Sequence, residues 1–153
     1  PIINADAKLQ GPAYAAEGAK EFAPPTEADR TAPALSVKPI SISFATGQHT
    51  LTENAKTLID LQLAEIAKTF ANVRVRVEGN TDNVGSKQMN MNLSKKRAQS
   101  VADYLQKTYD MDPDRFIIIG NGPDKPVPGC ESNSTPECRA KNRRTEFQLL
   151  ASS

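Results

Sequence analysis

The chain has 153 residues, of which 38% are hydrophobic and 24% are charged. Its 19 lysines and arginines nearly balance 18 aspartates and glutamates, giving a formal net charge of +1 without any block of basic residues. This balance argues against nucleic-acid binding driven by phosphate neutralisation. No apolar run approaches the length that spans a bilayer, and the chain is long enough for one domain with a hydrophobic core and a tail.

Residues 1–36 differ in character from the rest of the chain. They are rich in alanine and proline and show no sustained period. We interpret them as a linker or the remnant of a preceding domain, because the chain starts without methionine or a signal-like segment. Regular patterns predict one domain over residues 37–150 and a tail at 151–153. In the alternative interpretation, apolar side chains of the first segment dock on this domain as an ordered arm: Ile2, Ile3, Leu9, Tyr14 and Phe22.

The domain begins with a predicted strand and a predicted helix. Ile40, Ile42 and Phe44 alternate with serines, which indicates a strand with Phe44 on its core face. Thr50 and Glu53 have the spacing of a capping box, so a helix is expected from this point. Its apolar stripe consists of seven residues: Ala55, Leu58, Ile59, Leu63, Ile66, Ala67 and Phe70.

A second strand, a turn and a second helix are predicted next. Valines alternate with charged residues over 73–78, so a half-buried strand leads to Gly79 and to a turn over 80–85. The second helix starts near Ser86 and has an apolar stripe of its own: Leu93, Ala98, Val101, Ala102, Leu105 and Tyr109. Three polar residues share one side of this helix: Asn90, Ser94 and Arg97.

A third strand and a short helix follow. The continuous apolar run at 116–119 indicates a strand buried on both faces, and the Asp-Pro pair at 112–113 marks the break before it. Thr135 followed by Pro136 is typical of an N-cap and the first residue of a helix, which should end near Asn142.

A last strand is expected over 145–150, with Phe147 and Leu149 facing inward. The order of elements predicts an α/β fold, a two-layer sandwich of a small mixed sheet of about four strands with two main helices on one face. Right-handed crossovers would then place the ligand site at one sheet edge, where the turn at 80–85 meets the second helix.

The turn and the second helix together suggest a receptor for a zwitterion. Asp82 lies just past a strand end, and Arg97 on the helix can lean back toward it. This pair offers one carboxylate for an ammonium group and one planar guanidinium for a carboxylate. The simpler alternative is that Asp82 bonds to its own turn and Arg97 is solvated on the helix surface.

Three motifs strengthen the first interpretation: G-N-T-D-N-V-G at 79–85, N-M-N-L-S-K-K-R-A at 90–98, and N-R-R at 142–144. In order, type and spacing they resemble the OmpA-like peptidoglycan-binding domain, whose pattern is G-H/N-T-D-x-x-G, N-x-x-L-S-x-x-R-A and N-R-R. The resemblance covers about residues 37–150. In that family the domain binds the cell wall without a covalent bond, by holding the diaminopimelate residue of the stem peptide.

The resemblance implies roles for individual residues. Asp82 would accept a hydrogen bond from the diaminopimelate ammonium, Arg97 would pair with its carboxylate, and Asn90 would add polar contacts. Five more residues are expected to support the site: Thr81, Phe44, Leu93, Arg143 and Arg144. Many family members carry an acid directly after the first strand, where this chain has Ala45, so ligand preference should differ; backbone amides over 45–47 could contribute instead.

The only two cysteines, Cys130 and Cys138, flank a polar, turn-rich stretch. Their even number, the short loop and the oxidising compartment favour a disulfide, which would stabilise the fold by ~2 kcal/mol. A zinc site is not supported, because His49 is the only histidine and no C-x-x-C spacing occurs. We therefore expect neither a metal nor a cofactor.

The residues favour a binding module rather than an enzyme. A serine or cysteine nucleophile lacks a neighbouring base, since His49 lies in a polar loop, and no two carboxylates are clearly placed opposite one another. We expect a cell-wall anchor in the periplasm or cell envelope of a Gram-negative bacterium, with the stem peptide as its partner. Two alternatives remain open: a module that holds a partner protein's carboxylate or acidic loop, and a tether for an upstream solute-binding domain.

Overall fold

The computed structural model describes residues 22–35, 40–64 and 73–150. Within these ranges four strands form one mixed sheet in the order β2-β5-β3-β4. Strand β5 pairs antiparallel with both β2 and β3, and β3 pairs parallel with β4. The strands have these bounds: β2 (Ile40–Ser43), β3 (Arg74–Asn80), β4 (Phe116–Gly120) and β5 (Arg144–Leu150). The predicted mixed sheet is thereby confirmed.

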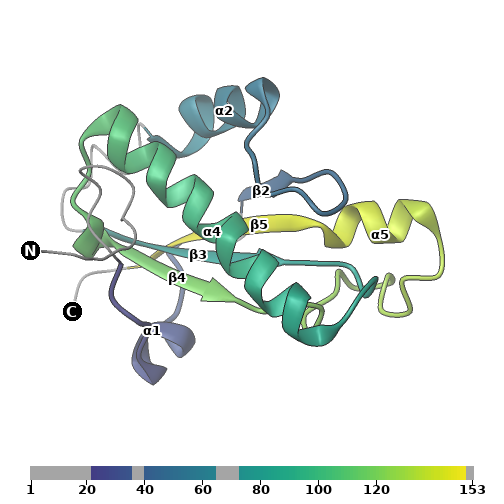
Figure 1. Cartoon of the computed structure of the whole chain (residues 1–153). Coiled ribbons are helices and arrows are strands. Elements are labelled where there is room, and N and C mark those ends of the chain that lie inside the picture. The colour runs from purple at the N-terminus through teal and green to yellow at the C-terminus, as the bar shows by residue number, and fades with distance from the viewer. Residues whose placement is uncertain (1–21, 36–39, 65–72, 151–153) are drawn as a thin grey trace, which may run out of the picture.

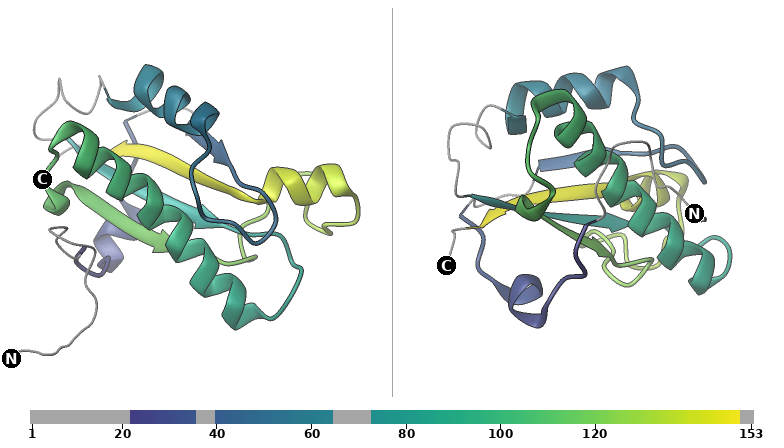
Figure 2. Two further views of the ribbon diagram at one scale, coloured as in Figure 1. Left: turned by 45° about the horizontal axis from the view of Figure 1, so that its top comes forward. Right: turned by 60° about the vertical axis from the view of Figure 1, so that its left-hand side comes forward.

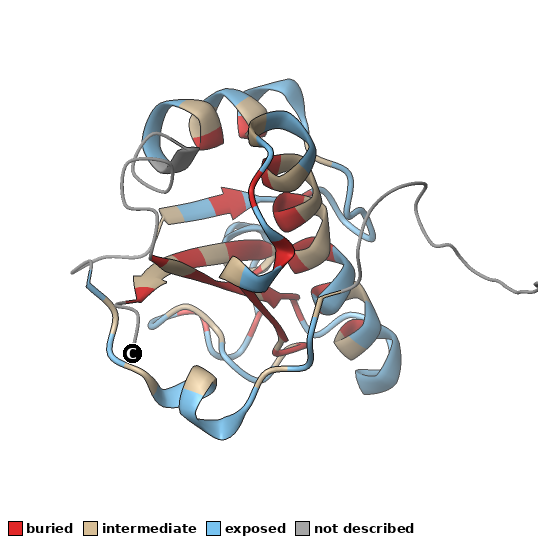
Figure 3. Ribbon diagram, turned by 90° about the vertical axis from the view of Figure 1, so that its left-hand side faces the viewer, coloured by how far each residue is buried: buried red, intermediate tan, exposed pale blue. Residues whose placement is uncertain are grey.

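Two helices cover one face of this sheet, as the sequence predicts (Figure 1). They are α2 (Glu53–Ile59), which continues as a π-helical turn η1 (Asp60–Ala64), and the long α4 (Lys87–Tyr109). The short helix α1 (Glu27–Thr31) lies on the opposite side of the sheet (Figure 2). Figure 3 shows that buried residues are concentrated on the strands and on the helix sides that face them. None of the described helices is both long enough and apolar enough to cross a membrane.

The start of α2 differs from the predicted capping box. Thr52, not Thr50, is the N-cap, and its hydroxyl accepts a hydrogen bond of 3.0 Å from the amide of Ala55. Ala55 and Ile59 are buried as the apolar stripe predicts. The cap lies two residues later because Thr52 reaches the third amide of the first turn, which leaves Thr50 in the preceding loop. The rest of the predicted stripe, from Leu63 to Phe70, lies outside the side chains that the structure describes.

The later helices begin at the cap residues that the sequence predicts. Ser86 is the N-cap of α4 and accepts from the amide of Met89 at 3.1 Å, and the helix ends before Asp110, whose φ is 55°. A short 3₁₀ turn η2 (Pro113–Arg115) precedes β4. Helix α5 (Pro136–Asn142) starts at the predicted Thr135 cap with proline in its first turn. Such caps are local, which explains why the sequence alone located these helices.

Strand β4 is buried on both faces, as its continuous apolar run predicts. Phe116 and Ile118 belong to the main core between the sheet and helices α2 and α4, whereas Ile117 and Ile119 contact Leu150 on the other face. Phe44 and Phe147 are also buried in the main core, and Leu149 packs against it. The inward-facing residues of the predicted strands are therefore confirmed.

The opposite face of β3 is more buried than its alternation predicts. Arg76 is only 7% exposed, because residues 22–35 run across this side of the sheet. Its guanidinium donates to Gln148 and to the backbone carbonyl of Ala32 at 2.7 Å. Phe22, by contrast, packs against the main core, where its ring meets that of Phe116 edge to face with centroids 5.9 Å apart. From the sequence alone, a charged residue in a strand is expected to face solvent. Here a segment that is distant in sequence covers it.

Helix α4 lies unusually close to the sheet at two glycines. A Cβ atom added to Gly79 would stand 1.7 Å from the backbone oxygen of Ser94, and one added to Gly120 would stand 2.8 Å from the Ser94 hydroxyl. The same hydroxyl accepts from the amide of Gly122 at 2.9 Å. The glycine of the first motif and the serine of the second thus fix the depth of α4 on β3 and β4, and with it the position of the motif side chains.

Candidate ligand-binding site

A cavity of about 320 Å³ lies beyond the C-terminal end of β3, where the turn after this strand meets α4. Since β3 is an inner strand, the cavity is at the end of the sheet and not at a sheet edge, which corrects the predicted location. Residues of all three motifs and of the loop after β2 line it: Thr46, Gly47, Thr81, Asp82, Val84, Gly85, Met89, Asn90, Leu93, Arg97 and Arg143. The structure therefore brings together six of the eight predicted site residues.

Asp82 holds the turn and still faces the cavity. Its Oδ1 atom accepts from the amide of Val84 at 3.1 Å, and its Oδ2 atom accepts from Nη1 of Arg143 at 3.2 Å. The side chain is 8% exposed. The simpler interpretation, an aspartate bonded to its own turn, thus holds for one oxygen only. Oδ1 accepts from the backbone of the turn, whereas Oδ2 pairs with a guanidinium. A carboxylate accepts about four hydrogen bonds, so Asp82 retains capacity for a ligand donor.

Arg97 is fully buried, contrary to the interpretation of a solvated helix residue. Three backbone carbonyls fix its guanidinium: Nε donates to Gln48 at 2.8 Å, Nη1 to Asn80 at 2.9 Å and Nη2 to Ala45 at 3.1 Å. The ring of Phe44 lies 5.2 Å from its central carbon. A guanidinium has five N–H donors, so one donor on each terminal nitrogen remains.

Arg97 stays charged although its surroundings lower its pKa. Burial lowers the pKa of its guanidinium to about 10, with the nearby Asp82 raising it and Arg143 lowering it. The side chain therefore stays protonated at neutral pH. Two guanidinium groups and one carboxylate line the cavity, which leaves one net positive charge in a confined space. Such a site favours a ligand that brings a carboxylate of its own.

The loop after β2 contributes to the site through its backbone carbonyl groups. The sequence suggested backbone amides at 45–47, but here Ala45 and Gln48 use their carbonyl oxygens to hold Arg97. Thr46 and Gly47 line the cavity. The methyl side chain of Ala45 carries no charge, so the net positive charge of the cavity is not offset at this position.

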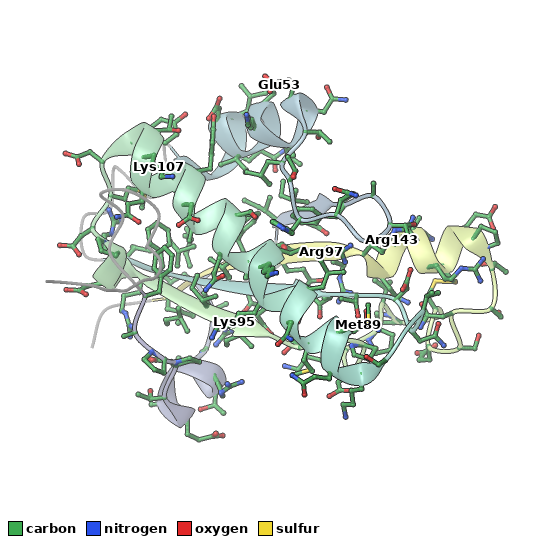
Figure 4. The ribbon with its side chains drawn as sticks, in the orientation of Figure 1. Glu53, Met89, Lys95, Arg97, Lys107 and Arg143 are labelled. Carbon is green, nitrogen blue, oxygen red and sulfur yellow. A yellow bond between two sulfur atoms is a disulfide. The ribbon has the colours of Figure 1, made fainter. Side chains whose placement is uncertain are left out.

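The two arginines of the third motif lie in different surroundings. Arg143 lines the cavity, and its Nε donates to the carbonyl of Phe44 at 3.1 Å (Figure 4). Arg144 does not line it: it is the first residue of β5, and its side chain lies on the same face of the sheet as that of Glu146, two residues on. It pairs with Glu146 at 2.6 Å and donates to the carbonyl of Lys125 at 2.9 Å. Arg144 therefore supports the sheet and the 121–127 loop.

The remaining predicted residues form the walls. Asn90 is 5% exposed and donates to the carbonyl of Val84 at 3.1 Å, which ties the turn to the first part of α4. Thr81 is buried, and its amide donates to Gly122 at 3.0 Å. At the rim, Val84 and Met89 are 58% and 66% exposed, which is unusual for large apolar side chains. Sequence reasoning missed these two, since neither belongs to the fixed positions of a motif.

Asn142 is a further residue that sequence reasoning did not assign. It is fully buried and donates to the carbonyl of Cys130 at 3.0 Å and to Asn133 at 2.9 Å, while its oxygen accepts from the amide of Val127 at 2.6 Å. The predicted disulfide between Cys130 and Cys138 is present, with Cα atoms 5.0 Å apart. Disulfide and asparagine together hold the loop that precedes Arg143. The place of Asn142 in the N-R-R motif was the signal in the sequence that could have identified this role.

Comparisons with known proteins agree with this architecture. The chain is 37% identical over 109 residues to outer membrane protein A of Bordetella avium, covering 71% of this chain and 54% of that protein. It is 42% identical over 86 residues to the peptidoglycan-binding protein ArfA of Mycobacterium bovis, covering 56% of this chain and 25% of that protein. The chain thus spans only part of the length of these curated relatives.

A solved structure and a family model cover most of the domain. The cell wall anchor of the T6SS from Pseudomonas aeruginosa superposes with a TM-score of 0.60 at 30% identity, over 76% of this chain and 84% of that chain. The model of the OmpA family matches residues 43–143, a range that contains the cavity and its lining residues. The chain belongs to the OmpA family.

Proposed function

We propose that this chain is a non-catalytic anchor that binds peptidoglycan by holding the free, zwitterionic end of a diaminopimelate residue. The observation that carries the proposal is that Asp82 and Arg97 line one cavity, with two N–H donors of Arg97 left over from its three bonds to backbone carbonyls. Relatives named as a peptidoglycan-binding protein and as a cell wall anchor support it. Relatives named as outer membrane proteins support a place in the cell envelope of a Gram-negative bacterium.

The cavity matches such a ligand in charge and in polarity. The ammonium would donate to Asp82, and the carboxylate would accept from Arg97, with Arg143 beside it as a second cation. The methylene chain of the ligand would lie against the apolar side chains of Val84, Met89 and Leu93. The backbone carbonyls that fix Arg97 reduce the ordering cost of binding, because the guanidinium is already oriented.

Calorimetric titration of meso-diaminopimelate into the protein tests this proposal. We expect saturable binding by the native chain and its loss in Asp82→Asn, which keeps the shape of the side chain and removes its charge. Asp124→Asn is the matched control, because Asp124 is exposed and its one ion pair among the described residues is with Lys87 at 3.5 Å. Binding that survives in Asp82→Asn would contradict the ammonium assignment.

Co-sedimentation with purified cell-wall sacculi extends the test to the polymer. The native chain and Asp124→Asn should sediment with sacculi, whereas folded Asp82→Asn should remain in solution. Free meso-diaminopimelate at high concentration should release the native chain from the pellet. A native chain that ignores both sacculi and meso-diaminopimelate would refute the anchor function and favour a module that binds a protein partner.

A further inference from the structure

A second cavity, of about 380 Å³, adjoins the first. Its lining residues come from the loop after β2 and from the exposed side of α4: Gly47, His49, Met89, Asn92, Leu93 and Lys96. We call it the α4 subsite. The family motifs leave most of it unassigned, since His49 and Met89 lie outside the three motifs and Asn92 and Lys96 occupy variable positions of the second.

The two cavities are direct neighbours. Gly47, Met89 and Leu93 line both of them, so they form a common wall. On α4, Met89, Leu93 and Lys96 follow one another at intervals of four and three residues and therefore share one helix face. A ligand larger than a single amino acid, held at one end in the first cavity, would continue along this face.

The chemistry of the α4 subsite favours an anion. Lys96 is its one charged lining residue, and among the described residues no carboxylate forms an ion pair with it. His49 and Asn92 add polar side chains. The exposed apolar side chain of Met89 lines both cavities. The subsite thus offers one cation and hydrogen-bonding groups next to an apolar wall.

We propose that the α4 subsite binds the free carboxylate of the glutamate residue joined to diaminopimelate in the stem peptide, with Lys96 as its cation. This inference rests on the function proposed for the first cavity, because that cavity sets where the ligand enters. Lys96 pairs with the carboxylate, and His49 and Asn92 supply hydrogen bonds to the same group. The subsite thus makes the chain selective for the form of the stem peptide in which the glutamate carboxylate is free.

Two synthetic tripeptides test the inference by calorimetry: L-Ala-γ-D-Glu-meso-diaminopimelate and its counterpart in which the glutamate carboxylate is an amide. The native chain should bind the acidic peptide about two- to fivefold more tightly, the range expected for one exposed ion pair. In Lys96→Gln this preference should disappear. Lys95→Gln is the matched control: it removes the same charge from the next residue, whose backbone lies against Gly120 on the strand β4 side.

The outcomes separate the two proposals. Equal affinity of the native chain for both tripeptides, together with binding of meso-diaminopimelate, would overturn the α4 subsite and leave the first cavity intact. A preference that persists in Lys96→Gln, or that is lost equally in Lys95→Gln, would also overturn it, since another group or the overall charge would then be responsible. Absence of binding by all three ligands would instead refute the proposed function of the first cavity.

Discussion

Arg143 Nη1 lies 3.2 Å from Asp82 Oδ2, an ion pair between residues 61 positions apart. This contact joins the last of the three motifs to the first and places a second guanidinium beside the buried Arg97. The third motif therefore contributes Arg143 to the cavity wall. The position of Arg143 depends in turn on the loop before it.

Arg97→Lys should both destabilise the fold and abolish ligand binding. A lysine ammonium has no fork geometry, so it cannot replace the bonds to Ala45, Gln48 and Asn80 and still face the cavity. We expect the free energy of unfolding in urea to fall by about 2–4 kcal/mol, because buried carbonyls lose their partners. Arg30→Lys, at an exposed position, is the control and should change it by less than about 0.5 kcal/mol. Equal stability of the two variants would contradict this role of Arg97.

Asn142→Ala should lower stability even though the residue does not line the cavity. The substitution leaves the carbonyl of Cys130, the Asn133 side chain and the amide of Val127 without their partner. We expect a loss of about 2–4 kcal/mol in the free energy of unfolding. Asn54→Ala, on the exposed side of α2, should be nearly neutral.

The effect of Asn142 on binding should act through Arg143. If the braced loop positions this arginine, Asn142→Ala should weaken binding of meso-diaminopimelate in the native background and have no further effect in Arg143→Ala. Additive losses of affinity in the double variant would show that the two residues act independently.

Gly79→Ala should be much more harmful than Gly85→Ala. At Gly79 an added methyl group collides with the backbone of Ser94, which cannot yield without moving α4 away from β3. We expect a loss of at least about 3 kcal/mol or a failure to fold. Gly85 has a φ of 91° but open space around it, so its substitution should cost only about 1–2 kcal/mol of backbone strain. Thermal unfolding of both variants makes the comparison, and a milder effect at Gly79 would contradict the close approach.

Asp29 should make the attachment of the N-terminal segment dependent on acid pH. Hydrogen bonding from the backbone of Thr26 and from Arg74 lowers the pKa of this carboxyl below its usual value of 3.8. Because the folded-state pKa lies below that of the unfolded chain, the stabilisation is complete above about pH 4 and disappears as the pH falls through the folded-state pKa.

The measurement compares unfolding free energies of the native chain and Asp29→Asn across pH. The native chain should be more stable by about 0.5–1 kcal/mol at pH 7, since the Arg74 pair is partly exposed, and the difference should shrink as the pH falls below 3.8. Glu27→Gln, in the same turn without such a pair, is the control. A difference between native chain and Asp29→Asn that does not change with pH would contradict this account.

The sequence by itself determined the local elements and the identity of the family. Alternation, apolar stripes and capping residues located the strands, α4 and α5, because these signals involve neighbours within a few residues. The spacing of Cys130 and Cys138 similarly predicted their disulfide. The fixed motif spacing also selected Asp82, Asn90 and Arg97, all of which line the cavity.

Only the tertiary structure decided what these side chains contact. Arg143 and Arg144 are adjacent and chemically identical, yet Arg143, the C-cap of α5, pairs with Asp82 at the cavity, whereas Arg144, the first residue of β5, pairs with Glu146 on the sheet. The alternation in the sequence suggests a solvated Arg76, whereas in the structure the N-terminal segment covers it. Asn142 is expected only as the end of a helix, whereas in the structure its side chain holds the preceding loop. In each case the partner lies on an element distant in sequence, and local periodicity carries no information about which distant backbone groups will need a hydrogen bond.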